Sequence, residues 1–327
     1  MRIWKPALAA SCGVALFTIP PAFACELLAP GIISTGLKET SAAFAPDGNT
    51  VYFVRSDASE VNDTILVSHL ENGRWKTPRV ASFSGRWHDS GPAQSPSGKR
   101  LYFVSNRPVH PGDAPLTISV GGKQYPGTNL WYVERQPDGN WGKPVHVDGT
   151  LNNGAMLYHP TVAENENIYF SAHRKDSGKF YQIYVVRPTK TGYTAPQRLD
   201  LGNVKHNRMD PSIAPNGRFL VYAGNEGDST GSADIYIVFR QKDGSWNKPE
   251  RLAGDVNSGA LENSPTLGQK FGVLYVSSQR HPELQFPKNP RDNYTSLQTR
   301  LQSPLNGSRN IWRCNISALL HEHGINH

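Results

Sequence analysis

Cysteine is scarce in this chain. It occurs three times in 327 residues, at positions 12, 25 and 314. Cys12 lies in an apolar leader, so an exported mature chain would keep only Cys25 and Cys314. Two cysteines in an oxidising compartment predict one disulfide, which here would join the two ends of the chain. Two free thiols are the alternative.

Long apolar runs are missing after residue 24, where no stretch approaches the roughly 18 apolar residues that a membrane-spanning helix needs. Before that point, Arg2 and Lys5 precede a largely apolar stretch and the small-x-small sequence Ala22-Phe23-Ala24. This pattern is typical of a secretory signal peptide, residues 1–24. We therefore expect a periplasmic or secreted protein without a membrane span, cleaved near Ala24. Lipid attachment at Cys25 is an alternative, although the residues before it fit a lipobox poorly.

Motifs of known catalytic and metal sites are also missing. The sequence has no Gly-x-Ser-x-Gly, no His-Glu-x-x-His, no phosphate-binding glycine loop and no dense run of aspartates. His88 and His159 could form a metal pair, but no His-x-His or Cys-x-x-Cys spacing supports one. We therefore expect no metal and no cofactor, and we assign no catalytic residue from a motif.

The chain has little excess charge. Without Arg2 and Lys5, the 34 basic residues fall to 32 against 27 acidic residues, an excess of five. The basic residues are scattered and form no run with interleaved aromatic residues, so nucleic acid is not an expected partner.

A repeat of about fifty residues is abundant instead. Its clearest copy begins at Asp210 and reads as four short strands, with tight turns at Asn216-Gly217 and Asp243-Gly244. Five copies follow one another. Because one small sheet cannot bury both of its faces alone, strand repeats of this length predict the blades of a propeller. The expected blades are residues 39–88, 89–157, 158–208, 209–261 and 262–317.

The fifth repeat lacks an outer strand, which residues 27–34 could supply. The ring would then be closed by an N-terminal strand, and Cys25 would lie beside Cys314. The predicted fold is therefore all-β, a single domain of residues 25–327 that forms a five-bladed β-propeller of four-stranded antiparallel blades.

The repeats resemble a known family. The turn Pro46-Asp47-Gly48, the following Tyr52-Phe53 and a later serine-to-arginine segment, Ser105-Asn106-Arg107 and Ser277-Ser278-Gln279-Arg280, are similar to the TolB-type repeat of bacterial periplasmic propellers. The resemblance covers about residues 27–317. It implies the propeller fold, which by itself does not assign a function.

The two faces of the predicted propeller differ. One face has tight turns, whereas the other has the long loops 108–128, 224–233 and 281–309, and long loops on a rigid scaffold often bind partners. Polar residues gather where the inner strands begin, at the loop-side mouth of the central channel. The ligand-binding candidates there are His88, Asp89, Arg107, Tyr158, His159, Arg174, Arg208, Asp210, Glu262 and Arg280. Structural hydrogen bonds and ion pairs are the competing explanation for each of them.

These features favour a non-catalytic binding or scaffolding module, expected to be a monomer, that engages a protein partner or a cell-envelope glycan through its loop-rich face. The alternative is a carbohydrate-active hydrolase or lyase. Such an enzyme would use two carboxylates from different blades, chosen from Glu39, Asp89, Asp210 and Glu262.

Overall fold

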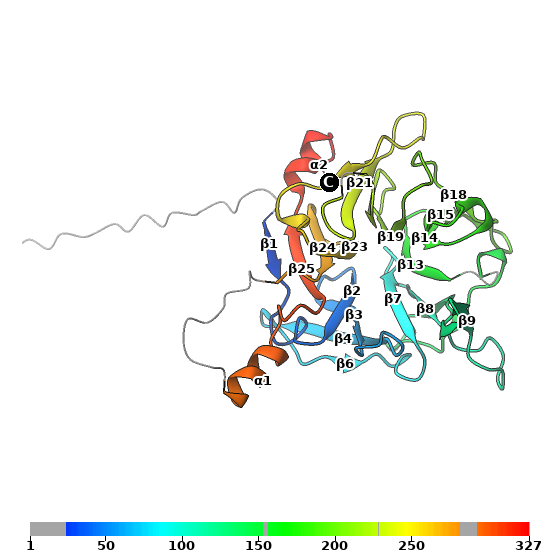
Figure 1. Ribbon diagram of the computed structural model, residues 1–327. Coiled ribbons are helices and arrows are strands. Elements are labelled where there is room, and N and C mark those ends of the chain that lie inside the picture. Colours follow the sequence, from blue (N-terminus) through cyan, green and yellow to red (C-terminus); the bar gives the residue numbers. More distant parts are fainter. Residues whose placement is uncertain (1–23, 153–155, 228, 282–292, 327) are drawn as a thin grey trace, which may run out of the picture.

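The computed structural model describes residues 24–152, 156–227, 229–281 and 293–326. The predicted signal peptide, apart from Ala24, lies outside these residues. Five four-stranded antiparallel sheets are arranged in a ring around a central channel (Figure 1). The chain is a five-bladed β-propeller, as the repeats predict.

In blades 1 to 4 the strands follow each other in chain order from the channel outward, whereas blade 5 takes its outermost strand from the N-terminal end. Blade 1 consists of β2 (Lys38–Phe44), β3 (Thr50–Ser56), β4 (Thr64–Glu71), the short β5 (Arg74–Trp75) and β6 (Arg79–Val80). Blade 2 consists of β7 (Asp89–Gln94), β8 (Arg100–Ser105), β11 (Asn129–Glu134) and β12 (Val145–His146), with the hairpin β9 (Thr117–Val120) and β10 (Lys123–Pro126) in its long loop.

The remaining blades are built in the same way. Blade 3 has β13 (Leu157–Val162), β14 (Ile168–Ala172), β15 (Gln182–Val186) and β18 (Gln197–Arg198), with a hairpin of β16 (Pro188–Thr189) and β17 (Gly192–Tyr193). Blade 4 has β19 (Arg208–Ile213), β20 (Phe219–Gly224), β21 (Asp234–Phe239) and β22 (Glu250–Arg251). Blade 5 has β23 (Glu262–Leu267), β24 (Val273–Ser278), β25 (Asn310–Asn315) and β1 (Cys25–Leu27).

Helical segments are short and lie outside the blades. They are the α-helices α1 (Tyr294–Gln302) and α2 (Ser317–Glu322) and the 3₁₀ turns η1 (Thr150–Asn152), η2 (Lys175–Ser177) and η3 (Gly254–Val256).

The ring is closed by both ends of the chain. Strand β1 pairs with β25, so that Cys25 lies opposite Cys314, and the two form a disulfide. The predicted disulfide is thus confirmed. Because the Cys25 sulfur is bonded to that of Cys314, it is not available for attachment of a lipid. The closing strand begins earlier than residues 27–34. Leu28 and Ile33 instead enter the core between blades 5 and 1, which the turn after β1 makes possible.

The core is divided into five clusters, one at each junction between neighbouring blades. Because central strands are covered on both faces, they are mostly apolar, as in β20 and β21, where every residue is buried and only Asp234 is charged.

The repeated aromatic residue of the third-to-outer turn joins one blade to the blade before it. Trp141 of blade 2 donates a hydrogen bond from Nε1 to the Tyr52 hydroxyl of blade 1 at 2.8 Å, and the hydroxyl groups of Tyr193 and Tyr102 lie 3.3 Å apart. Blade 5 has no such turn because its outer strands come from the two chain ends. Leu320 of α2 and Ile325 pack in the junction of blades 4 and 5 instead.

Candidate functional site

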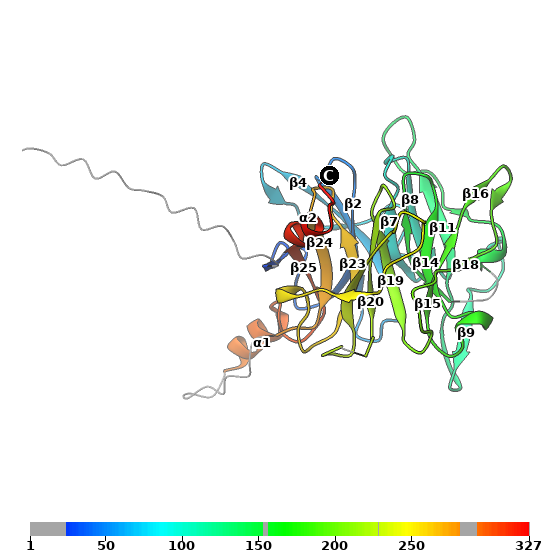
Figure 2. The same cartoon turned by 90° about the horizontal axis from the view of Figure 1, so that it is seen from above.

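The two ends of the channel differ in loop length. Helix α1 and the β9–β10 hairpin project from one edge of the ring, and the β16–β17 hairpin projects from the other (Figure 2). The first edge is the loop-rich face, at which the inner strands begin. The second is the tight-turn face, with turns such as Asn216-Gly217 between the first two strands of a blade.

Three of the predicted carboxylates begin inner strands, and all three are fully buried: Glu39, Asp89 and Glu262. Each accepts a hydrogen bond from a hydroxyl group four or five residues earlier. The donors are Thr35 (2.6 Å), Ser84 (2.8 Å) and Ser258 (2.6 Å). The backbone N–H groups of Thr35 and Ser258 donate to Glu39 and Glu262 at 3.0 Å. These carboxylates tie each crossover loop to the strand that follows it.

An arginine at the end of the second strand completes each of these anchors. Its guanidinium lies 3.0 Å from Glu39 for Arg55, 2.6 Å from Asp89 for Arg107 and 3.4 Å from Glu262 for Arg280. Arg107 and Arg280 also donate to crossover carbonyl groups, those of Phe83 and Val256. Burial lowers the pKa of Arg280. The candidate arginines are thus engaged inside the protein.

Blades 3 and 4 depart from this arrangement. In blade 4 the inner strand begins with Arg208, whose Nε lies 2.6 Å from Glu226, so acid and base exchange places. In blade 3 the inner strand begins with Leu157, and Arg174 donates to the carbonyl oxygens of Thr150 and Leu151 at 3.3 Å.

Each of the five inner strands is interrupted by a β-bulge. One residue in each inner strand has a positive φ: Ser41, Gly91, His159, Asp210 and Ser264. His159 Nε2 and the Ser41 hydroxyl lie 2.7 Å apart, a hydrogen bond between blades 3 and 1. Asp210 accepts hydrogen bonds from the backbone N–H of Ser264 at 3.0 Å and from its hydroxyl at 3.4 Å. His159 and Asp210 therefore lie deeper in the channel than Asp89 and Glu262.

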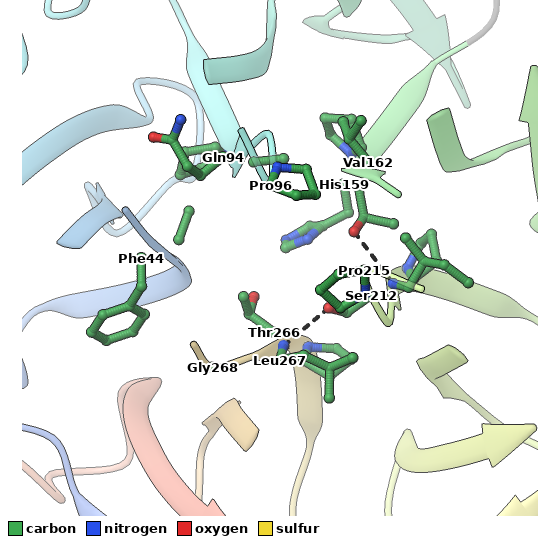
Figure 3. Close-up of a pocket in the computed structure, with 18 of the residues that line it drawn as sticks. Phe44, Gln94, Pro96, His159, Val162, Ser212, Pro215, Thr266, Leu267 and Gly268 are labelled. Atoms are coloured by element: carbon green, nitrogen blue, oxygen red, sulfur yellow. Dashed lines mark hydrogen bonds between the residues drawn. The ribbon is translucent and has the colours of Figure 1, made fainter. Parts of the chain in front are cut away.

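A cavity of about 220 Å³ lies between these bulges and the tight-turn face. The His159 ring points into it, opposite Gln94 and Thr266 (Figure 3). Six proline rings line its wall: Pro92, Pro96, Pro160, Pro211, Pro215 and Pro265. Hydroxyl groups in the wall already accept hydrogen bonds from neighbouring strands, such as Ser212 from the N–H of Leu267 at 3.0 Å. The cavity is polar but offers few charges.

A second cluster, which the sequence reasoning missed in part, lies near the channel on the loop side. It is built around Asp63, just before β4. Burial raises the pKa of Asp63, and the nearest base is His88, whose Nε2 lies 4.0 Å from Oδ2. Burial also raises the pKa of Tyr158, with contributions from Tyr181, Asp210 and Asp63. The carboxylates of Asp210 and Asp63 thus both act to raise the pKa of the Tyr158 hydroxyl. A single aspartate before a third strand gave no sequence signal.

The long loop of blade 5 ends in α1. Asn293 caps this helix by accepting a hydrogen bond from the N–H of Ser296, and its C-terminal end contacts Gly36 through the carbonyl of Gln302. No side chain of α1 is buried, and Tyr294 is 73% exposed. Most of this loop before Asn293 lies outside the described residues.

In the described part of the chain, no group of three or more His, Cys, Asp and Glu side chains is arranged to hold a metal ion. Nor does that part contain a helix long and apolar enough to cross a membrane.

No family model matches this chain. A curated relative, the "uncharacterized peptidase YuxL" of Bacillus subtilis, is 23% identical over 230 residues, which is 65% of this chain and 34% of that protein. The chain thus spans about a third of that relative.

Similar solved structures include TolB proteins and a glycosidase. A putative TolB from Agrobacterium tumefaciens has 14% identity and a TM-score of 0.46, covering 85% of this chain and 90% of that one. An α-L-arabinofuranosidase from Lactobacillus brevis has 12% identity and a TM-score of 0.53, covering 87% and 92%. At such identities the likeness concerns the fold, and the resemblance of the repeats to the TolB type agrees with it.

Proposed function

We propose that this chain is an exported, non-catalytic binding propeller that engages a protein partner or a cell-envelope glycan through its loop-rich face. The supporting observation is that Glu39, Asp89 and Glu262 are fully buried and bound by arginines and hydroxyl groups. A carboxylate that is fully buried and already bound in this way does not contact a substrate in the channel. Three of the four carboxylates considered for catalysis are thus better explained as blade anchors.

The same face offers contact area for a large partner. Tyr294, Leu297 and Leu301 follow the i, i+3, i+7 spacing of one helical stripe on α1, and Leu301 is 58% exposed. Leu37, which is 55% exposed, follows the Gly36 that contacts the helix. Exposed apolar side chains gathered on one element are typical of interaction surfaces.

The test combines binding and turnover. Mature protein would be screened by thermal shift against cell-wall fragments and oligosaccharides, and used to capture envelope proteins. Captured partners would be identified and their affinities measured with purified components. We expect Tyr294→Ala/Leu301→Ala to weaken a protein complex, whereas Val145→Ala, at an exposed residue of β12 (Val145–His146), should not. A saturable glycan shift that is lost on substitution of the channel residues would support the glycan instead.

The carbohydrate-active hydrolase or lyase keeps one specific observation in its favour. Burial raises the pKa of Asp63, as a general acid requires. The negative charges of Asp63 and Asp210 both raise the pKa of Tyr158. If the chain cleaved aryl glycosides and Asp63→Asn or Asp210→Asn abolished turnover without loss of folding, the non-catalytic proposal would be wrong.

Export and oligomeric state belong to the same proposal. N-terminal sequencing of protein from the periplasm or medium should begin at Cys25, and sedimentation should give one chain per particle.

A further inference from the structure

We propose that the cleft between blades 3 and 4 binds an acidic glycan, that is, a chain of sugars that carry carboxylate groups. The cleft measures about 540 Å³ and lies between strands β15 and β18 of blade 3 and the β21–β22 turn of blade 4. That turn belongs to the tight-turn face, so this site is separate from the loop-rich face and does not depend on the function proposed above.

Charge is the first argument. Arg187, Arg240 and Lys248 line the cleft, against one carboxylate, Asp200. Arg198 also borders it, but its guanidinium lies on the other face of β18, the face of its cross-strand partner Tyr184. Among the described residues, only Arg198 of these four lies within 4.0 Å of a carboxylate, with its Nε 3.8 Å from Asp176. Arg240 donates to the carbonyl of Gly217 and the hydroxyl of Tyr169, and Arg187 donates to Gln197. The positive charge of the cleft is therefore largely uncompensated.

Hydrogen-bonding capacity is the second argument. The Arg187 guanidinium donates to Gln197 through Nη1 alone, which leaves its other donors for a ligand, and the side chain of Lys248 is exposed. The Gln197 side chain already accepts from Arg187, and the Asn247 oxygen accepts from the N–H of Phe239 at 2.7 Å. The cleft thus has donors to spare and few free acceptors. A ligand that fits it must bring acceptors, and carboxylates are the strongest partners of guanidinium groups.

The neighbouring cleft between blades 2 and 3 shows that this charge is not a general property of the fold. Lys99, Arg100 and Arg135 line that cleft together with Glu134, Glu164 and Glu166. Arg100 and Glu134 form an ion pair at 2.9 Å. Three cations there face three anions, whereas between blades 3 and 4 three cations, Arg187, Arg240 and Lys248, face one anion.

Shape and aromatic surface favour a glycan over a lipid surface. Trp246 is half-buried in the cleft wall, with the Arg240 guanidinium 4.6 Å above its ring. A half-exposed indole is an amphipathic surface that suits the apolar faces of sugar rings. The volume of the cleft lies within the range of roughly 300–1,000 Å³ that is typical of small-molecule sites. Binding to a bilayer would instead rely on apolar side chains that protrude from the protein into the lipid.

The experiment uses the mature protein and calorimetric titration with a short oligogalacturonate. The fully methyl-esterified form of the same oligosaccharide is the neutral control. We expect saturable binding of the acidic form that weakens with added salt, and no binding of the ester. Arg187→Gln/Lys248→Gln should weaken binding about tenfold or more. Lys248→Gln should weaken it detectably, whereas Lys99→Gln, which removes the same charge from the balanced cleft, should leave it unchanged.

Several results would overturn the proposal. They are absence of binding to the acidic oligosaccharide, equal binding of the ester, and equal weakening by Lys99→Gln, which would indicate bulk charge. Equal affinity for duplex DNA or for vesicles of phosphatidylglycerol would show an unselective cationic patch. The substituted side chains of Arg187 and Lys248 are exposed, so thermal melting should be unchanged. These substitutions should also leave capture of a partner by the loop-rich face unchanged. Loss of glycan binding and loss of partner capture can therefore be observed separately, so that either proposal can fail without the other.

Discussion

Blade 2 and blade 3 solve the same structural problem with different chemistry. Blade 2 ties its crossover loop to the inner strand through Asp89 and Arg107, both buried and 2.6 Å apart. Blade 3 has the apolar Leu157 at that place, and its Arg174 donates only to carbonyl groups of the crossover. Blade 4 keeps an ion pair but reverses it, with Arg208 on the inner strand. Acidic residues at the channel mouth are therefore interchangeable parts of the scaffold, which weighs against a catalytic role for them.

The sharpest way to break this comparison is to remove the same arginine from both blades. Arg107→Gln should lower the free energy of unfolding by about 3–5 kcal/mol, because it leaves the Asp89 carboxylate buried without its partner. Arg174→Gln should cost only about 1 kcal/mol, since it removes hydrogen bonds to neutral carbonyl groups. Urea denaturation of both variants measures the difference. Equal losses would mean that the arginines act through packing and not through the carboxylate.

Blade 5 has the same anchor as blade 2 but is assembled from both chain ends. Its disulfide joins positions 289 residues apart. Cys25→Ser/Cys314→Ser should therefore lower the free energy of unfolding by about 2–5 kcal/mol, because the open chain gains entropy when it unfolds. Denaturation of the double variant against the oxidised protein gives the value. Should the variant be as stable as the parent, the β1–β25 pairing and the Glu262 anchor close the ring without help.

The reversed pair of blade 4 provides a test of intermediate size. Arg208→Leu introduces the residue type found in blade 3 and should cost about 2–3 kcal/mol, because it leaves Glu226 largely buried without its cation. Adding Glu226→Gln should restore most of that loss, since a neutral amide is easier to bury than a carboxylate. A double-mutant cycle measures the coupling between the two side chains. An additive result would contradict the view that the pair acts as a unit.

The fold could be predicted from the sequence because its signals are local and repeated. Turns such as Asp243-Gly244 fix the hairpins, and Trp141 marks where one blade meets the next. The site was harder. A carboxylate at the start of a strand looks the same in sequence whether it binds a ligand or an arginine.

The sequence spacing between a carboxylate and a later arginine could have distinguished a structural carboxylate from a ligand-binding one. The charged partners of inner-strand residues lie 16 or 18 residues later, as in Glu39–Arg55 and Asp89–Arg107. Asp63 had no such signal because its environment comes from burial and from His88, which lies 25 residues later, just before β7. The position of His159 in the channel depends on a bulge, whose positive φ no residue preference announced.

Asp63 extends the comparison to a buried carboxylate without an arginine. Asp89 has a guanidinium at 2.6 Å, whereas the nearest base to Asp63 is an imidazole at 4.0 Å. Burial raises the pKa of Asp63, so the folded state binds its proton more tightly than the unfolded state does. Its contribution to stability is therefore full below the unfolded pKa, near 3.9, and is lost as the pH rises through the folded pKa.

Asp63→Asn removes this titration, and we expect the smallest effect of the series. The stability of the parent relative to the variant should fall as the pH rises from about 4 toward neutrality, because only the parent must then hold a buried charge. Urea denaturation of both proteins at pH 4, 5, 6 and 7 gives the difference curve, in which the titration of shared groups cancels. The opposite slope would mean that His88, when protonated, stabilises the Asp63 carboxylate more than burial disfavours it. Asp63 would then join the paired carboxylates, and the main structural argument for an acid at the channel would disappear.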